Sequence, residues 1–307
     1  MPSSNPILRI ATRKSPLALW QAQHVKAALE YAHPQLQVEI IGMMTEGDKL
    51  LATPLAAIGG KGLFVKELEK AILERRADIA VHSLKDMPVE LRDHLILAAV
   101  CEREDPRDAF VGRQYTQLED LPPGAIIGTS SSRRHCQVKA LRPDLLVESV
   151  RGNVGTRLMR LDEGRYDGLI LAAAGLKRLD EASRISQYLD PMTWLPAVGQ
   201  GVLAIECQRD NMQALEYVAA LEDSPTRICI TAERAMNKAL DGGCQLPIAA
   251  YAELTGSELI VRGMVGDMKN NQMLTAEVRG QAANAETLGL QLAEVLLQQG
   301  ARRILDH

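Results

Sequence analysis

Three segments of the sequence place hydroxyl and guanidinium side chains directly after an apolar run. They are residues 10–16 (IATRKSP), 128–134 (GTSSSRR) and 150–157 (VRGNVGTR). A strand followed by a helix would put these side chains at a helix N-terminus, where unpaired N–H groups and partial positive charge attract anions. Helix capping with solvated arginines is the alternative for any one segment. Three such segments favour one shared anion site, and they leave open whether the anion is phosphate or several carboxylates.

A fourth segment, residues 81–88 (VHSLKDMP), ends an apolar run with polar side chains. Asp86 beside Lys85 can act as an acid or base, or stabilise a cation formed during a reaction. The alternative is a loop in which Asp86 only turns the chain. Residues 59–62 (GGKG) permit close approach of the backbone, so that Lys61 can meet an anion there. This glycine-rich segment lacks the GxxxxGK[ST] spacing of a P-loop.

Cys244 differs from the other cysteines because two glycines precede it. The segment DGGCQ follows a predicted helix over residues 226–240, so Cys244 would lie on an accessible turn. Its thiolate is the reactive form, and nearby cations favour it. Without a CxxC pair or an HxxxH pattern, we expect neither a disulfide framework nor a metal site. The other four cysteines lie in or beside apolar or helical stretches, as small buried residues do: Cys101, Cys136, Cys207 and Cys229.

The elements that must position these residues alternate between strand and helix over the first two thirds of the chain. Runs rich in β-branched residues predict strands at residues 7–11, 38–43, 79–83, 96–100, 126–128, 145–150, 168–172 and 201–205. Apolar residues at three- and four-residue spacing predict helices at residues 16–31, 64–75 and 154–163. This alternation predicts an α/β architecture with helices on both faces of a sheet.

The last third of the chain has a different pattern. After the helix over residues 226–240, the pattern predicts three strands and a closing helix, at residues 248–254, 259–264, 273–278 and 285–299. We expect this part to be a small α+β domain. The charged residues 102–108 and the segment 196–201 (PAVGQG) are interpreted as two crossings between α/β domains. The predicted domains are residues 1–101 with 202–219, residues 102–201, and residues 220–307.

Composition excludes some classes of protein. The formal net charge is -4 and aromatic residues make up 3 % of the chain, whereas nucleic-acid binders are usually basic and use aromatic stacking. Residues 131–178 nevertheless hold ten Lys or Arg against five Asp or Glu, which indicates a local anion site. No segment has the length of a membrane span or the pattern of a signal peptide. We therefore expect a cytoplasmic protein that binds neither nucleic acid nor membrane.

Eight segments together resemble the porphobilinogen deaminase family, also called hydroxymethylbilane synthases, over nearly the whole chain. They occur in the family's order and spacing: IATRKSPLALWQA, GGKGLFVKELE, DIAVHSLKDMP, CEREDPRDAF, GTSSSRR, RGNVGTRL, LPAVGQG and DGGCQ. The resemblance implies two domains like the halves of a periplasmic binding protein, followed by a small domain that carries Cys244. It also implies a monomeric transferase of tetrapyrrole (haem and porphyrin) biosynthesis. Such an enzyme condenses four porphobilinogen molecules head to tail, releases ammonia each time, and frees hydroxymethylbilane by hydrolysis.

The resemblance also implies a cofactor and a set of site residues. The cofactor is a dipyrromethane, assembled from the substrate and attached covalently through Cys244. Asp86 resembles the family's catalytic aspartate, which assists loss of the amino group and stabilises the cation that follows. Contacts with the cofactor are implied for Cys244, Lys85, Thr129, Ser131, Arg133, Arg134, Gly175, Arg13 and Ser15. Contacts with substrate carboxylates are implied for Arg13, Arg151, Arg157, Arg178, Lys61 and Gln200.

Two other functions fit part of the pattern. A non-catalytic solute-binding protein for an anion would explain the α/β halves and the arginines, but it gives Cys244 no role. A hydrolase with a cysteine nucleophile would need a histidine base within reach of the thiol. No histidine lies near Cys244 in the sequence, although residues distant in sequence can meet in the fold.

Overall fold

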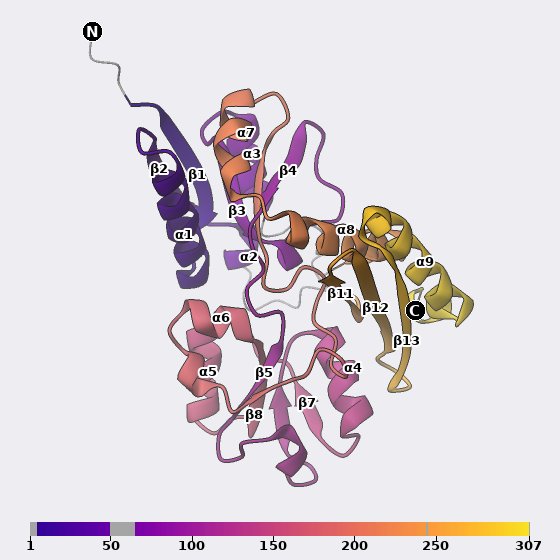
Figure 1. Cartoon of the computed structure of the whole chain (residues 1–307). Helices are drawn as coiled ribbons and strands as arrows, with labels where there is room; N and C mark the ends of the chain where they lie inside the picture. Colours follow the sequence, from indigo (N-terminus) through magenta and orange to yellow (C-terminus); the bar gives the residue numbers. More distant parts are fainter. Residues whose placement is uncertain (1–4, 50–64, 244, 307) are drawn as a thin grey trace.

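The computed structural model describes residues 5–49, 65–243 and 245–306. Within these ranges the chain forms three bodies, each built on its own sheet (Figure 1). The first and second bodies are α/β units that lie one above the other in the view of Figure 1, and the third lies beside them and ends the chain. The predicted fold class, two α/β domains joined to a small α+β domain, is confirmed.

The first body contains a mixed five-stranded sheet in the order β2-β1-β3-β10-β4. β1 pairs in parallel with β2 and β3, whereas β10 runs antiparallel to both β3 and β4. One apolar cluster packs helices α1 and α7 on one face, and another packs α3 on the opposite face. The elements are β1 (Ile7–Arg13), α1 (Pro16–Ala32), β2 (Gln37–Met43), α2 (Glu46–Lys49), α3 (Lys66–Leu73), β3 (Ile79–Ser83), β4 (Leu95–Val100), β10 (Leu203–Gln208) and α7 (Met212–Val218).

The second body repeats this design with shorter strands, in the order β7-β6-β8-β5-β9. β6 pairs in parallel with β7 and β8, and β5 runs antiparallel to β8 and β9. Helix α4 packs on one face, and α5 and α6 pack on the other. The elements are β5 (Asp108–Gly112), β6 (Ile126–Gly128), α4 (Ser132–Leu141), β7 (Leu146–Glu148), α5 (Val154–Asp162), β8 (Gly168–Ala172), α6 (Ala173–Arg178) and β9 (Gln187–Tyr188).

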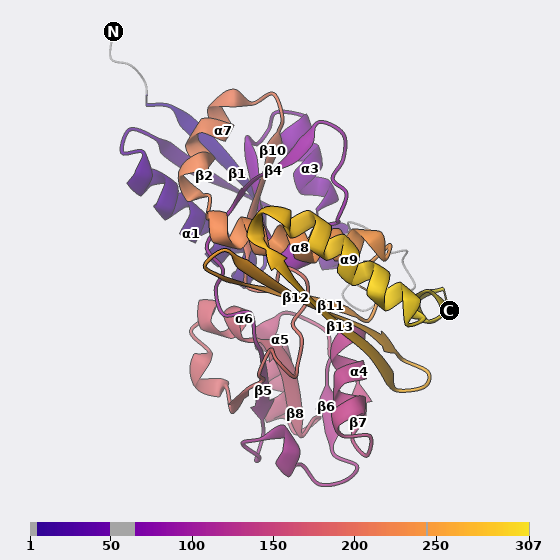
Figure 2. The ribbon, with the colours of Figure 1, turned by 45° about the vertical axis from the view of Figure 1, so that its right-hand side comes forward.

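The third body is an antiparallel sheet, β11-β12-β13, covered on one face by helices α8 and α9 (Figure 2). Its other side approaches α4 so closely that a Cβ on Gly266 would lie 2.6 Å from the Cys136 sulfur. A glycine is therefore needed where the second and third bodies meet. The elements are α8 (Ser224–Ala239), β11 (Ile248–Thr255), β12 (Glu258–Asp267), β13 (Gln272–Gln281), α9 (Ala285–Gln298) and α10 (Ala301–Leu305).

The chain crosses between the first two bodies twice, and the crossings lie side by side. Gly201 has φ +90°, and a Cβ there would come within 2.3 Å of the Glu104 carbonyl oxygen. The Arg103 guanidinium meets the buried carboxylate of Glu233 on α8 at 2.6 Å. Glu233 also accepts hydrogen bonds from the backbone N–H groups of Gly199 and Ala252. One carboxylate therefore ties both crossings to the third body.

Most predicted strands and helices are confirmed, and the differences have physical reasons. The predicted strand at 145–150 is only Leu146–Glu148, and the one at 201–205 begins at Leu203 because the backbone turns through left-handed Gly199 and Gly201. The predicted hinge over residues 102–108 ends inside β5, because Asp108 is neutralised there by distant arginines. The elements that were not predicted are α2, β5, α6, β9, α7 and α10.

Candidate functional site

A small pocket of about 50 Å³ lies at the carboxyl ends of β1 and β3. Arg13 is the last residue of β1, and Ser15 caps α1 by accepting a hydrogen bond from the Ala18 N–H. Both line this pocket together with His82, at the end of β3, and Asp86. We call it the edge pocket. The structure therefore brings together the first and fourth segments that the sequence singled out.

Lys85 and Asp86 lie on a 3-10 helix, Leu84–Asp86, that follows β3 directly. Asp86 is exposed, and the Lys85 ammonium donates a hydrogen bond to the Gln200 side chain at 3.4 Å. Burial lowers the pKa of Lys85 to about 8, and the positive charges of Arg134 and Arg133 add to this effect. Lys85 lies in the first body, yet it is close enough to the second body for the arginines there to lower its pKa.

The second segment opens helix α4 as predicted. Ser131 is the N-cap, and its hydroxyl accepts a hydrogen bond from the Arg134 N–H at 3.4 Å. The buried Thr129 hydroxyl accepts one from the Ser131 N–H at 3.2 Å. Side-chain caps of this kind satisfy helix N–H groups that otherwise have no partner. The hydroxyls therefore fix the direction of α4, which carries Arg133 and Arg134.

Arg133 and Arg134 converge on Asp108, a residue that the sequence analysis did not single out. Each guanidinium lies 2.7 Å from one Asp108 oxygen. The side chains of Trp194 and Gln200 each donate a further hydrogen bond to Asp108, both at 2.9 Å. Burial alone would raise the pKa of Asp108, but the two arginines hold it far below its usual value. The signal for this site was a lone Asp at the start of an apolar run, DAFVG.

The third segment opens helix α5, whose N-cap is Asn153. Burial, followed by the nearby charges of Arg134 and Arg151, lowers the pKa of Arg157 to about 10, although Asp86 opposes them. The Arg157 Nε donates a hydrogen bond to the Gly152 carbonyl at 2.8 Å. Arg157, Arg134 and Asp86 are therefore electrostatic neighbours, although they come from different bodies and from three separate segments.

Arg178 and Gly175 lie on α6 beside the start of α1. The Arg178 guanidinium donates a hydrogen bond to the Gly201 carbonyl at 2.7 Å and lies 5.8 Å from the Trp20 ring centre. Gly175 is buried, and a Cβ there would lie 3.8 Å from Leu17. Both residues thus belong to the junction between the first and second bodies.

Two predicted site residues, Lys61 and Cys244, lie outside the described residues. The backbone ahead of position 244 is defined: a Cβ on Gly242 would lie 1.8 Å from the Asn237 side-chain oxygen, so a side chain there would displace the end of α8. Burial raises the pKa of each of the other four thiols to about 11, at Cys101, Cys136, Cys207 and Cys229. These four are therefore protonated, weak nucleophiles at neutral pH.

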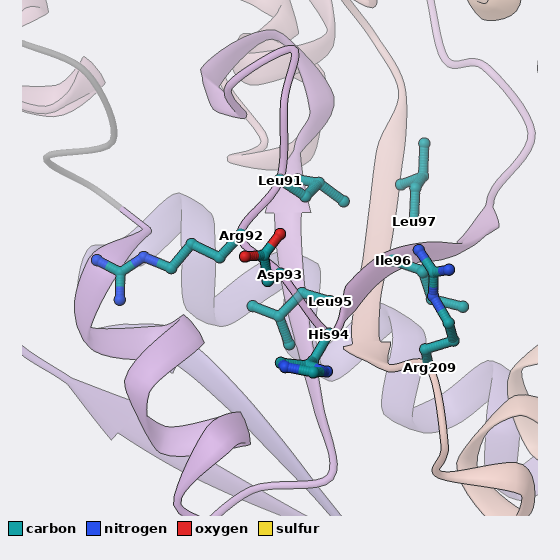
Figure 3. Close-up of a pocket in the computed structure, with 8 residues that line it drawn as sticks. All are labelled: Leu91, Arg92, Asp93, His94, Leu95, Ile96, Leu97 and Arg209. Atoms are coloured by element: carbon teal, nitrogen blue, oxygen red, sulfur yellow. The ribbon is translucent and has the colours of Figure 1, made fainter.

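A larger pocket of about 610 Å³ lies away from these residues, along the segment that leads into β4. Figure 3 shows Arg92 and Arg209 on opposite sides of this pocket, with His94 between them. None of the predicted site residues that the structure describes lines it. Within residues 5–49, 65–243 and 245–306, no cluster of three His, Cys, Asp or Glu side chains is arranged to hold a metal ion. Across the same part of the chain, every helix is too short or too polar to cross a membrane.

The donor set suits a molecule with several carboxylates. Cations from the first body (Arg13, Lys85) and the second (Arg134, Arg157) face one another around Asp86. Burial is the main cause of the lowered pKa values of Lys85 and Arg157, and neighbouring arginines add to it, so bound carboxylates would stabilise both cations. An arrangement of this kind can hold a dipyrromethane with its acidic side chains.

Comparison with known proteins agrees with this chemistry. Residues 8–216 match the family model described as "Porphobilinogen deaminase, dipyromethane cofactor binding domain". Residues 227–298 match the model of the "Porphobilinogen deaminase, C-terminal domain". Solved structures with a related chain path include the methionine-binding protein MetQ, at 12 % identity and a TM-score of 0.46, which covers 76 % of this chain and 94 % of that one. Another is the aliphatic sulphonate binding protein SsuA from Escherichia coli, at 13 % identity and a TM-score of 0.41, with 76 % and 70 % covered.

The two family models cover the segments that contain Asp86, the arginines and the turn before Cys244. Together they span most of the chain, and the first is the domain that binds the dipyrromethane cofactor. The chain therefore belongs to the porphobilinogen deaminase family of hydroxymethylbilane synthase transferases.

Proposed function

We propose that this protein condenses four porphobilinogen molecules head to tail on a dipyrromethane attached through Cys244, and then releases hydroxymethylbilane by hydrolysis. The observation that carries the proposal is that Lys85 from the first body and Arg157 from the second both lie near the exposed carboxylate of Asp86, with Arg134 near both cations. Each porphobilinogen brings an acetate and a propionate group. A growing chain of such units is a polyanion that these cations can neutralise.

The residues of the site divide this work between charge and position. Arg13, Lys85 and Arg157 would bind substrate or cofactor carboxylates. Arg13 also pairs with Asp48, and Arg133 and Arg134 share their charge with Asp108. Asp86 is exposed beside them and would stabilise positive charge that develops when the amino group leaves. When bound, the dipyrromethane supplies the carbon to which the first substrate is joined. We infer a monomeric enzyme of the cytoplasm with porphobilinogen as its small-molecule substrate.

The experiment is an intact-mass measurement of the purified chain. We expect an added mass equal to two linked pyrrole units, and we expect Cys244→Ser to lack it because the thioether cannot form. The matched control is Cys101→Ser, which removes a weakly nucleophilic thiol and should keep the added mass. An active enzyme of unmodified mass contradicts the proposal, as does an anion-binding chain that has neither added mass nor turnover.

Asp86→Asn separates attachment from turnover in the same samples. The amide keeps the shape of the side chain but loses its charge, so the rate per loaded chain should fall on the order of 100-fold. Turnover near that of the wild type would remove Asp86 from the mechanism while leaving the attachment at Cys244 intact.

A further inference from the structure

Three ionisable side chains that the roles above leave unused lie inside the first body. Glu206 on β10 is fully buried, and His82 on β3 and Glu69 on α3 are nearly so. The His82 Nε2 atom lies 3.0 Å from a Glu206 oxygen. Glu69 lies 2.7 Å from the guanidinium of Arg92, which is half exposed. A sheet face that otherwise carries apolar residues therefore contains an imidazole and two carboxylates.

The strand register aligns this group with the edge pocket. His82 pairs with Ala204 and Glu206 pairs with Ala80, so both side chains lie on the same face of the sheet. Ala11 also pairs with Ala80, which places Arg13, two residues further along β1, on that face as well. This is the face that α3 covers. Arg13 and His82 thus lie at the pocket edge, and Glu206 lies one step deeper into the sheet.

The Glu206 carboxylate is incompletely satisfied. One oxygen meets His82, and the other is buried without a hydrogen-bond partner in the described part of the chain. Glu69 has Arg92 as its counter-ion, yet burial, followed by the negative charge of Glu206, raises the pKa of Glu69. A buried carboxylate without a counter-charge costs several kcal/mol. In the described part of the chain, His82 is the group in hydrogen-bond contact with Glu206 that could balance its charge.

The His82–Glu206 pair lies beside the edge pocket. His82 lines the edge pocket with Asp86, and Arg13 and Ser15 complete that wall. Arg13 is already paired with Asp48 across this face, so its charge is shared. In this arrangement the imidazole lies between a buried carboxylate and a pocket that holds an exposed one. Such a pair can lend its proton toward the pocket, and one negative charge then stays in the interior until a proton returns.

We propose that His82 and Glu206 form a proton-holding pair for the condensation, which gives its proton to the departing amino group and takes one back from the ring carbon after the carbon–carbon bond forms. This inference rests on the proposed function. In each condensation the carbon–nitrogen bond of an aminomethyl group breaks and ammonia leaves. A carbon–carbon bond forms at a ring carbon, which loses its hydrogen as a proton. The proton of the pair leaves with the nitrogen as ammonia, and the ring-carbon proton restores the pair, so the cycle balances without an oxidant or reductant.

His82 is the member of the pair that faces the pocket, and Glu206 is a positioning residue that acts through it. Glu206 fixes the imidazole by a hydrogen bond and balances the charge when the imidazole carries the proton. Glu69, with its partner Arg92, and the nearby Lys66 are further charged groups around the pair. The purely structural alternative is a buried hydrogen bond between a neutral imidazole and an ionised carboxylate.

The first test measures charge and needs no activity. Glu206→Gln keeps a hydrogen-bond partner for His82 but removes the negative charge of the carboxylate. The variant should then no longer hold the proton of the pair, so one negative and one positive charge are lost together. The net charge of the folded protein at neutral pH should therefore stay unchanged, as read by native capillary electrophoresis of the Cys244→Ser background. The matched control is Glu216→Gln on the exposed side of α7, which should gain one positive charge unit. An equal gain in Glu206→Gln would overturn the proposal.

The second test uses the cofactor-loaded enzyme, with rates counted per loaded chain from the intact mass. With porphobilinogen deuterated at its free ring carbon, Glu206→Gln should show kcat lowered on the order of 100-fold, an unchanged KM, and a primary isotope effect that the wild type lacks. His82→Gln should match it, and the double variant should be no slower, because the two residues act as a unit. Wild-type kcat, or a slow rate without an isotope effect, would overturn the role.

The two proposals fail in different ways. A wild-type chain without the added mass and without turnover would contradict the proposed function itself. A loaded, active wild type whose Glu206→Gln variant gains a full charge unit contradicts only the proton-holding pair. If Glu206→Gln does not fold, His82→Gln carries the kinetic test alone, and a normal rate with the deuterated substrate would then reject the pair.

Discussion

Among the described residues, each of the two α/β bodies has one completely buried carboxylate near the candidate site, and the surroundings of the two differ. In the second body, Asp108 receives hydrogen bonds or ion pairs from Arg133, Arg134, Trp194 and Gln200. In the first body, Glu206 has His82 as its partner and keeps one oxygen without any in the described part of the chain. Both carboxylates are completely buried.

The two clusters are suited to different roles. A carboxylate surrounded by permanent cations stays ionised, and it fixes the geometry of the groups that hold it. A carboxylate whose only partner is an imidazole holds a charge that depends on where one proton resides. The Asp108 cluster is thus suited to orient the arginines, and the Glu206 cluster is suited to exchange a proton.

The largest expected effect comes from breaking the Asp108 cluster, in which every partner position of the carboxylate is used. Asp108→Asn leaves two buried guanidiniums without their counter-charge, and we expect a loss of about 3–5 kcal/mol in the free energy of unfolding. Urea unfolding followed by circular dichroism measures it. The isosteric Glu206→Gln is the matched comparison, and we expect a change of about 1 kcal/mol or less because an unsatisfied group is removed. Equal losses in the two variants would erase the distinction between the clusters.

The fold of both regions could largely be predicted because it depends on local patterns. Apolar runs followed by Ser15, Ser131 or Asn153 predicted helix starts, and all three residues are N-caps. Strand β5 was missed because its first residue is charged, and charged residues at that point resemble a hinge. Helix α6 was missed because it is only six residues long and follows β8 without a turn.

The Asp108 cluster could not be predicted, because its members are far apart in the sequence. Trp194 lies 86 residues from Asp108, and only the sheet order β8-β5-β9 brings the segments together. Glu206 was hidden for a related reason: it sits in LAIECQ, a run that favours a buried strand whatever its fourth residue is. A charge inside such a run is a signal that the search for motifs overlooked.

A smaller loss of stability is expected when the Asp108 cluster loses one of its several hydrogen-bond donors. Trp194→Phe removes the indole N–H that donates to Asp108 but keeps an aromatic ring in the core, while Arg133 still holds the same oxygen. We expect a loss of about 2 kcal/mol, the range for one hydrogen bond to a charged group. Trp20→Phe on the half-exposed side of α1 is the matched control, with about 0.5 kcal/mol or less. A Trp194→Phe loss as large as that of Asp108→Asn would mean that the indole, and not the arginines, holds the carboxylate.

The smallest expected effect is a difference in how the stability contributed by each cluster depends on pH. Burial, followed by the charge of Glu206, raises the pKa of Glu69, so the folded state binds this proton more tightly than the unfolded state does. Stability from Glu69 is therefore fully present below its usual pKa of 4.5 and is lost as the pH rises through the folded value. The arginines lower the pKa of Asp108, so its contribution is present above its usual 3.8 and is lost only in stronger acid.

The wild type should lose stability between about pH 4 and about pH 8 as Glu69 ionises, and Glu69→Gln should not show this loss. We expect the difference between variant and wild type to grow in the variant's favour over that range, by on the order of 1 kcal/mol. The difference between Asp108→Asn and wild type should stay constant over the same range, since Asp108 remains ionised throughout. Urea midpoints for the three proteins at several pH values measure both differences. A Glu69→Gln difference that does not vary with pH would mean that Arg92 already compensates Glu69 fully, and that the first body stores no excess negative charge behind His82.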